Sequence, residues 1–145
     1  MVEIKKILLP SDFSERTEKV CSYALSLAGK YGAEIDVIHV IHEDLDMSSF
    51  YVPHISFDVT ENEMMKGAEV KLKTFCDDHL KGKADYEIHV RKGTPFNEII
   101  EAAKAFGSDI IVMGTEGKTG IEHAIFGSTA ERVLKKSPIP VLTVR

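Results

Sequence analysis

The chain has 145 residues, a formal net charge of −5 and a mixed composition, which is the ordinary size for one compact domain. Its acidic balance argues against nucleic acid as a partner, because phosphate backbones are held by net positive surfaces. The first apolar run, Ile7–Leu9, is too short for a signal peptide, and no run approaches the roughly 20 apolar residues that span a bilayer. We therefore expect a cytoplasmic protein that does not bind membranes.

Cys21 and Cys76 are the only cysteines, and neither belongs to a CxxC pair or to a histidine cluster with zinc-ligand spacing. This spacing argues against a zinc site and favours two reduced thiols in the core over a disulfide or a redox pair.

Short apolar runs typical of β-strands alternate with helical patterns along the whole chain. Strands are predicted at 6–9, 35–41, 86–90, 110–113 and 141–144. Helices are predicted at 14–31, 60–79, 95–106 and 128–136. Gly32 and Gly107 are helix stop signals, Thr60 and Glu63 have the spacing of a capping box, and the polar segment 43–59 is expected to be a flexible loop. This order predicts an α/β fold: residues 1–145 form a single doubly wound (Rossmann-like) domain with a five-stranded parallel sheet and helices on both faces.

Ligands of doubly wound sheets bind beyond the carboxyl ends of the strands. The connection after the fourth predicted strand is long for a βα loop. It holds four of the ten glycines, namely Gly114, Gly117, Gly120 and Gly127. Glycines at such positions indicate positive φ or close approach of the backbone to a ligand, and the helix N-terminus at Ser128 offers amide donors to phosphate. Spacing alone leaves two readings open, a phosphate-binding loop and an ordinary loop with a Gly-Ser cap.

The commonest phosphate-binding signatures are absent. No GxxxxGK[ST] occurs, and the first strand is followed by Pro10–Ser14 instead of GxGxxG, so P-loop NTPases and Rossmann dehydrogenases are set aside. A response-regulator receiver is also a poor match, because Arg91–Gly93 follow the third strand where that fold needs a phosphorylatable aspartate.

Gly114-Thr-Glu-Gly117, nine residues and then Gly127-Ser128 resemble the G-x2-G-x9-G-[ST] signature of the ATP-binding branch of the universal stress protein family. The likeness extends to 5–14, 109–114 and 138–144, which look like that family's first, fourth and last strands. The resemblance implies a nucleotide site made of Pro10, Asp12, Val40, Met113, Gly114, Gly117, Gly127, Ser128 and Thr129. It implies ATP with its adenine against the backbone at Val40, its ribose or base near Asp12, its phosphates on the loop, and Mg²⁺ (or Mn²⁺) on the phosphates.

One residue departs from that family's pattern. Glu116 stands where similar sequences usually have a basic residue or histidine, and a carboxylate about 4 Å from a phosphate costs on the order of 1 kcal/mol in high dielectric. A cation between them, an outward side chain or the neighbouring Lys118 would offset this repulsion. Asp12 has an alternative role as a cap of the first helix together with Ser14.

The function that this resemblance implies is an ATP-binding regulatory module that is not an enzyme, apart from very slow hydrolysis. His39, His42 and His123 have no partner constellation, so we expect them to be structural or solvated. Two alternatives stay open: a slow ATP hydrolase or phosphoryl-transfer enzyme with Glu116 as its base, and a nucleotide-free interaction protein. ATP, ADP and AMP are not distinguished. The strand 141–144 is expected at a sheet edge, and pairing of that edge would give a homodimer.

Overall fold

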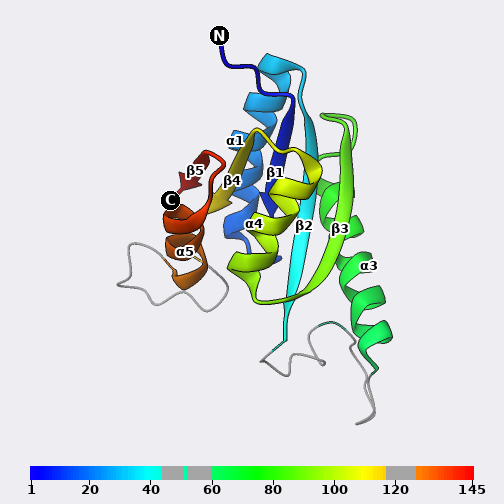
Figure 1. Cartoon of the computed structure of the whole chain (residues 1–145). Helices are drawn as coiled ribbons and strands as arrows, with labels where there is room; N and C mark the ends of the chain where they lie inside the picture. The colour runs from blue at the N-terminus through cyan, green and yellow to red at the C-terminus, as the bar shows by residue number, and fades with distance from the viewer. Residues whose placement is uncertain (44–50, 52–59, 117–126) are drawn as a thin grey trace.

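The structure, a computed structural model, describes residues 1–43, 51, 60–116 and 127–145. Its strands form one parallel sheet in the order β3-β2-β1-β4-β5, drawn in Figure 1. The strands are β1 (Lys6–Pro10), β2 (Glu34–His42), β3 (Tyr86–Gly93), β4 (Ile110–Gly114) and β5 (Val141–Val144). The helices are α1 (Arg16–Tyr31), α3 (Glu61–His79), α4 (Pro95–Phe106) and α5 (Ser128–Lys136).

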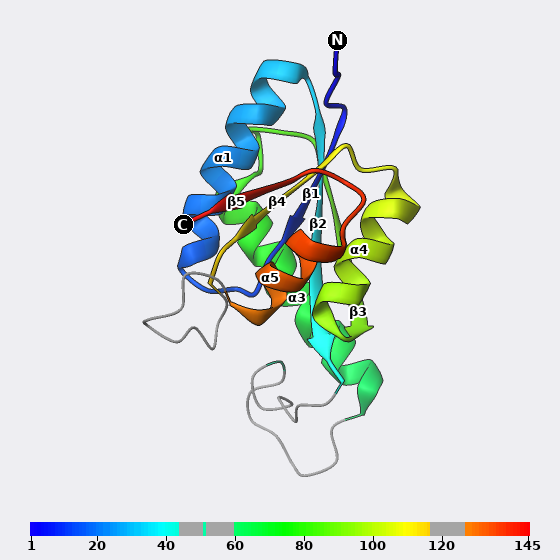
Figure 2. The ribbon, with the colours of Figure 1, turned by 60° about the vertical axis from the view of Figure 1, so that its left-hand side comes forward.

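Helices cover both faces of the sheet, as Figures 1 and 2 show. Ile7 and Leu9 of β1 pack into a core with residues of α1 and α3. Leu8 points to the opposite face and packs into a second core with residues of α4 and α5. All three side chains are fully buried, which is why this strand reads as a continuous apolar run in the sequence. The predicted doubly wound α/β domain is confirmed.

The predicted helix boundaries follow the local signals. Gly32 and Gly107 end α1 and α4 in the left-handed conformation, with φ of 65° and 68°, and Thr60 forms the capping box with Glu63. Helix α1 begins at Arg16, two residues later than predicted, because the chain before it forms a tight turn closed by Asp12. Strand β3 is longer than predicted because its pairing with β2 continues to Gly93.

The two thiols lie in the same core. Cys21 of α1 and Cys76 of α3 are free and buried, and burial raises the pKa of each to about 12. These are the reduced core thiols that the sequence predicts.

The order of the strands fixes where a ligand can enter. From β1 the chain moves to β2 and β3 on one side, and β4 and β5 then lie on the other. Loops leaving β1 and β4 therefore diverge at the carboxyl end of the sheet and leave a crevice there. Strand β5 lies at a sheet edge, as predicted. Within the described residues, no helix is both long and apolar enough to cross a membrane. The predicted loop 43–59 lies outside the description except for Glu43 and Tyr51.

Candidate functional site

A pocket of about 230 Å³ opens at this crevice, between the carboxyl ends of β1, β2 and β4 and the N-terminus of α5. Its lining contains eight of the residues predicted from the sequence: Pro10, Asp12, Val40, Met113, Gly114, Gly127, Ser128 and Thr129. The ninth, Gly117, lies outside the described residues. The structure thus brings distant parts of the chain to one pocket, while their contact with a ligand stays a prediction.

Asp12 closes the turn between β1 and α1. Its Oδ1 accepts hydrogen bonds from the backbone N–H of Ser14 at 2.9 Å and from the hydroxyl of Thr17 at 3.0 Å. The N-cap position of α1 belongs to Glu15, which makes no side-chain cap. Asp12 is therefore not the N-cap of the helix, but it fixes the approach to it and holds its own carboxylate at the pocket wall.

Phe13, in the same turn, has a φ of 64° and is the one residue other than glycine with positive φ in the described parts of the chain. A bulky side chain rarely adopts this conformation, which costs on the order of 1 to 3 kcal/mol and is tolerated where the surroundings enforce it. Here the ring of Phe13 packs on the imidazole of His39, with the centroids 4.2 Å apart. The turn is thus held by the hydrogen bonds of Asp12 and by the packing of Phe13 on His39.

His39 links three segments at the pocket wall. Its Nδ1 lies 2.8 Å from the backbone oxygen of Ser11, which can only accept, so Nδ1 donates. Its Nε2 lies 2.6 Å from the hydroxyl of Tyr51, and the neutral ring accepts that proton there. Burial raises the pKa of Tyr51 to about 12, so the hydroxyl stays protonated. With both nitrogens engaged, His39 acts as a structural histidine, as expected.

The two described glycines of the predicted phosphate-binding loop differ from the expectation of positive φ. Neither Gly114 nor Gly127 has positive φ, and Gly127 is the N-cap of α5 at φ −70°. A Cβ added to Gly114 would meet its nearest protein atom, a methyl group of Val20, at 3.4 Å. The protein itself therefore leaves room for alanine at Gly114, and close approach of a ligand stays the predicted reason for a glycine there. Gly117 and Gly120 lie outside the described residues.

The N-terminus of α5 supplies the pocket's donors. The N–H of Gly127 is already bound to the backbone oxygen of Thr115 at 2.5 Å, so it is not available to a phosphate. The first-turn amides of Ser128 and Thr129 have no acceptor within the helix, and the positive end of the helix dipole lies beside them. An anion in this pocket would meet these amides and the Ser128 hydroxyl.

Glu116, the departure from the family pattern, is paired. Its Oε2 lies 3.4 Å from Nε of Arg16, and both side chains line the pocket. The repulsion that Glu116 alone would exert on a phosphate is therefore offset by the adjacent guanidinium. The sequence prediction considered Lys118, outside the described residues, for this role and missed Arg16.

Tyr51 was also missed as a pocket residue. It lines the pocket and is buried, although it comes from the segment predicted to be a flexible loop. The signal available in the sequence was the group of aromatic residues in that polar segment, at 50, 51 and 57, because an aromatic side chain in a polar loop often packs back onto the domain. His42 lines the pocket as well, and His123 lies outside the described residues.

Fold and pocket together define a doubly wound α/β domain with a pocket at its topological switch point, bounded on one side by a helix N-terminus. The chain belongs to the universal stress protein family, whose sequence profile matches residues 3–145.

Individual relatives match over most of their length. The chain is 36% identical to Universal stress protein MJ0531 of Methanocaldococcus jannaschii, covering 97% of this chain and 82% of that protein. It is 33% identical to Universal stress protein MJ0577 of the same organism, covering 99% and 96%, and the solved structure of MJ0577 superposes with a TM-score of 0.81 at 30% identity, covering 99% and 96%. A universal stress protein from Archaeoglobus fulgidus, solved in complex with dAMP, has the same fold, with a TM-score of 0.69 at 21% identity and full coverage of both chains.

Proposed function

We propose that the chain is a regulatory module that binds an adenine nucleotide, ATP with Mg²⁺ (or Mn²⁺), in the pocket at the carboxyl end of the sheet. The observation that supports this most is the convergence of Asp12, Val40, Gly114 and the N-terminus of α5 on one pocket. These are the residues that the family signature assigns to the base, the ribose and the phosphates. A relative of the same fold was solved with dAMP, which is consistent with an adenine nucleotide as the ligand class.

The pocket suits a polyphosphate at the N-terminus of α5 and a flat base at the end of β2. Amides of Ser128 and Thr129 would receive phosphate oxygens, and Arg16 would add a positive charge at the same edge. The backbone at Val40, at the end of β2, offers hydrogen-bonding groups to a base, with Ile38 and Met113 lining the pocket nearby. Apolar walls with a few placed polar groups are the usual build of such sites.

A divalent cation fits this pocket as a companion of the phosphates and not as a protein-held ion. Both carboxylates of the lining already have partners, Asp12 with Ser14 and Thr17 and Glu116 with Arg16. Mg²⁺ commonly keeps several waters and takes its remaining ligands from phosphates. When bound, it would neutralise phosphate charge, while the protein groups orient the nucleotide.

We propose binding with negligible turnover. Hydrolysis needs a positioned base and groups that stabilise charge on the transferred phosphoryl group. Among the described pocket residues, His39 has both ring nitrogens engaged and Glu116 is paired with Arg16. A slow hydrolase is the alternative, and phosphate release within minutes in a single-turnover assay with Mg²⁺-ATP would favour it.

Thermal unfolding with and without Mg²⁺-ATP tests the binding proposal. A ligand present at a hundredfold excess over its Kd stabilises the native state by about 2.7 kcal/mol, which moves the midpoint by several degrees. Gly127→Val places a branched side chain at the start of α5 and should abolish the shift. Gly29→Ala is the matched control, because a Cβ there meets nothing within 4 Å; its shift should be retained. Absence of a shift in the unmodified chain with every adenine nucleotide would refute the proposal.

A further inference from the structure

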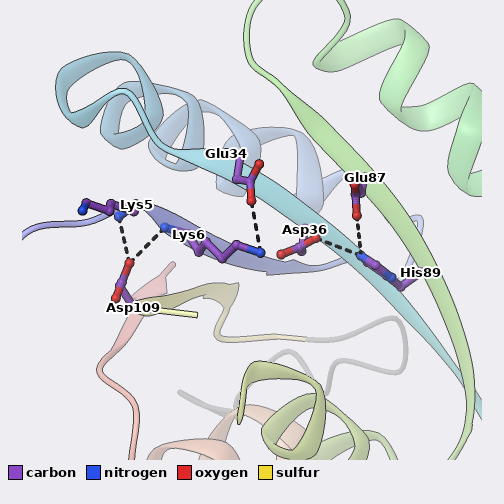
Figure 3. A network of polar contacts seen from close by, with 7 residues as sticks. All are labelled: Lys5, Lys6, Glu34, Asp36, Glu87, His89 and Asp109. Carbon is purple, nitrogen blue, oxygen red and sulfur yellow. Dashed lines mark hydrogen bonds and ion pairs between the residues drawn. The ribbon is translucent and has the colours of Figure 1, made fainter. Parts of the chain in front are cut away.

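A second cluster of polar side chains lies on the sheet away from the nucleotide pocket, near the amino ends of the strands (Figure 3). Asp36 of β2 is paired directly with Glu87 of β3, and His89 follows on the same face of β3. Nε2 of His89 lies 2.8 Å from Oδ1 of Asp36 and 3.9 Å from Oε2 of Glu87. The donor atoms of the three side chains all lie within 4.8 Å of one another.

Asp36 is the unusual member of this cluster. The residue is 4% exposed, and its Oδ2 has no hydrogen-bond partner within the described residues. A buried carboxylate oxygen without a partner is costly, because the charged form loses its hydration. The ammonium of Lys6, drawn in Figure 3, is bound to Glu34 at 3.1 Å. The cluster therefore contains one buried carboxylate oxygen without a hydrogen bond, Oδ2 of Asp36.

The surroundings of the cluster also favour a cation. Like charges directly opposite each other on adjacent strands repel, and Asp36 and Glu87 are such a pair. Phe106, the last residue of α4, stacks on the ring of His89 at a centroid distance of 4.2 Å. The C-terminus of α4, with the negative end of its dipole, thus lies beside the ring of His89.

We propose that Asp36, Glu87 and His89 form a binding site for a divalent transition-metal ion, with Zn²⁺ as the best match. Zinc binds histidine nitrogen and carboxylate oxygen at about 2.0 to 2.2 Å, which separates tetrahedral ligand atoms by about 3.4 Å. The observed distances of 2.8 and 3.9 Å lie on either side of that value.

The cluster is open to solvent at Glu87, so a metal ion can exchange with the solution. The side chain of Glu87 is 78% exposed, so the ion can enter from solvent and keep a water molecule in its fourth position. A nitrogen ligand selects against Mg²⁺ and Ca²⁺, which prefer oxygen alone. A bound ion would join the edge strand β3 to β2 independently of any nucleotide.

The test is Zn²⁺ binding to the full chain without nucleotide, measured by competition with a chromophoric chelator and by the thermal midpoint. The unmodified chain should bind Zn²⁺ and gain stability, and Mg²⁺ should give no gain. His89→Gln should weaken Zn²⁺ binding more than about tenfold, while its amide can still donate to Asp36 and preserve the fold. Glu87→Gln, at an exposed position, should also weaken it. His79→Gln on α3 is the control and should bind as the unmodified chain does.

The metal site is refuted if the unmodified chain does not bind Zn²⁺. It is also refuted if His89→Gln and Glu87→Gln both bind Zn²⁺ with unchanged affinity, or if His79→Gln weakens Zn²⁺ binding as much as they do. Co²⁺ used as a visible probe separates the ligand sets, because an intense thiolate charge-transfer band would place the ion on Cys21 and Cys76 instead. Mg²⁺-ATP binding should be the same in His89→Gln as in the unmodified chain, so failure of the metal site leaves the nucleotide proposal untouched.

Discussion

Glu116→Gln isolates the electrostatic contribution of the residue that departs from the family pattern. The carboxylate of Glu116 lies 3.4 Å from Nε of Arg16 at the edge of the pocket. Removing it takes one negative charge from the neighbourhood of the proposed phosphate site and releases the guanidinium to face a bound phosphate. One unit charge at about 4 Å is worth on the order of 1 kcal/mol in high dielectric, which corresponds to about a fivefold lower Kd for Mg²⁺-ATP.

Arg16→Gln should do the opposite and weaken Mg²⁺-ATP binding by a similar factor, because it leaves Glu116 uncompensated. The double substitution should bind ATP nearly as the unmodified chain does. Without ligand, all three variants should unfold within about 1 kcal/mol of the unmodified chain, since the side chains of the pair are 48% and 31% exposed and exposed ion pairs contribute little.

The assay is isothermal titration calorimetry with Mg²⁺-ATP, AMP and adenosine, at low and high salt. The gain in Glu116→Gln should be largest for ATP, absent for adenosine and reduced by salt, because exposed charges are screened. An equal gain for adenosine would show that the substitution changes the shape of the pocket and not its charge. No gain for ATP in either salt would refute the reasoning.

Four further predictions concern the surroundings of the pocket, the core and the edge of the sheet. Tyr51→Phe should destabilise the fold by about 1 to 3 kcal/mol, measured by urea unfolding, because it leaves Nε2 of His39 buried without its partner; Gly67→Ala should do so as well, because its Cβ would collide with the backbone of Tyr51. Burial raises the pKa of the Cys21 and Cys76 thiols from 9.0 to about 12, so between these pH values they ionise only in the unfolded chain. The free energy of unfolding should therefore be constant below about pH 9. It should fall as the pH rises toward 12, by up to about 1.4 kcal/mol per thiol per pH unit. A flat profile there would contradict their burial. Light scattering should give the mass of a homodimer, formed by pairing of the β5 edge, and a monomer mass at all micromolar concentrations would exclude it.

The fold was predictable because each element carries a local signal. The fully buried strands are continuous apolar runs, and Gly32 and Gly107 take the left-handed conformation that other residues avoid. The pocket was predictable in outline, because parallel strands bring their carboxyl ends to one side of the sheet and the glycine signature lies after one of them.

The partners inside the pocket were not predictable in the same way. The pair of Arg16 with Glu116 joins residues 100 positions apart, and nothing local in either segment marks it. The contact of Tyr51 with His39 comes from a segment whose sequence has no helical or strand periodicity, so nothing local predicts it. A weak signal existed in Gly67, a glycine inside α3 that lets the backbone of Tyr51 approach the helix. It becomes interpretable only when the two segments are seen together.

The two proposed sites follow from one property of parallel α/β sheets. Each strand leads into a helix, so helix N-termini gather at the carboxyl ends of the strands and helix C-termini at the amino ends. The N-terminus of α5 therefore offers free amides where an anion would bind, and the C-terminus of α4 lies beside His89, where a cation would bind. The two proposed sites lie toward opposite ends of β2, so nucleotide and metal should bind without competing. Saturating Zn²⁺ should therefore leave the Kd for adenosine unchanged within about twofold. Adenosine is the ligand of choice because it carries no phosphate that would chelate the metal. A larger change in the Kd would mean either that the two ends of the sheet are energetically coupled or that Zn²⁺ occupies the nucleotide pocket. Glu87→Gln separates these cases, because it should abolish an effect of Zn²⁺ bound at the Asp36 cluster and leave an effect of Zn²⁺ bound in the pocket.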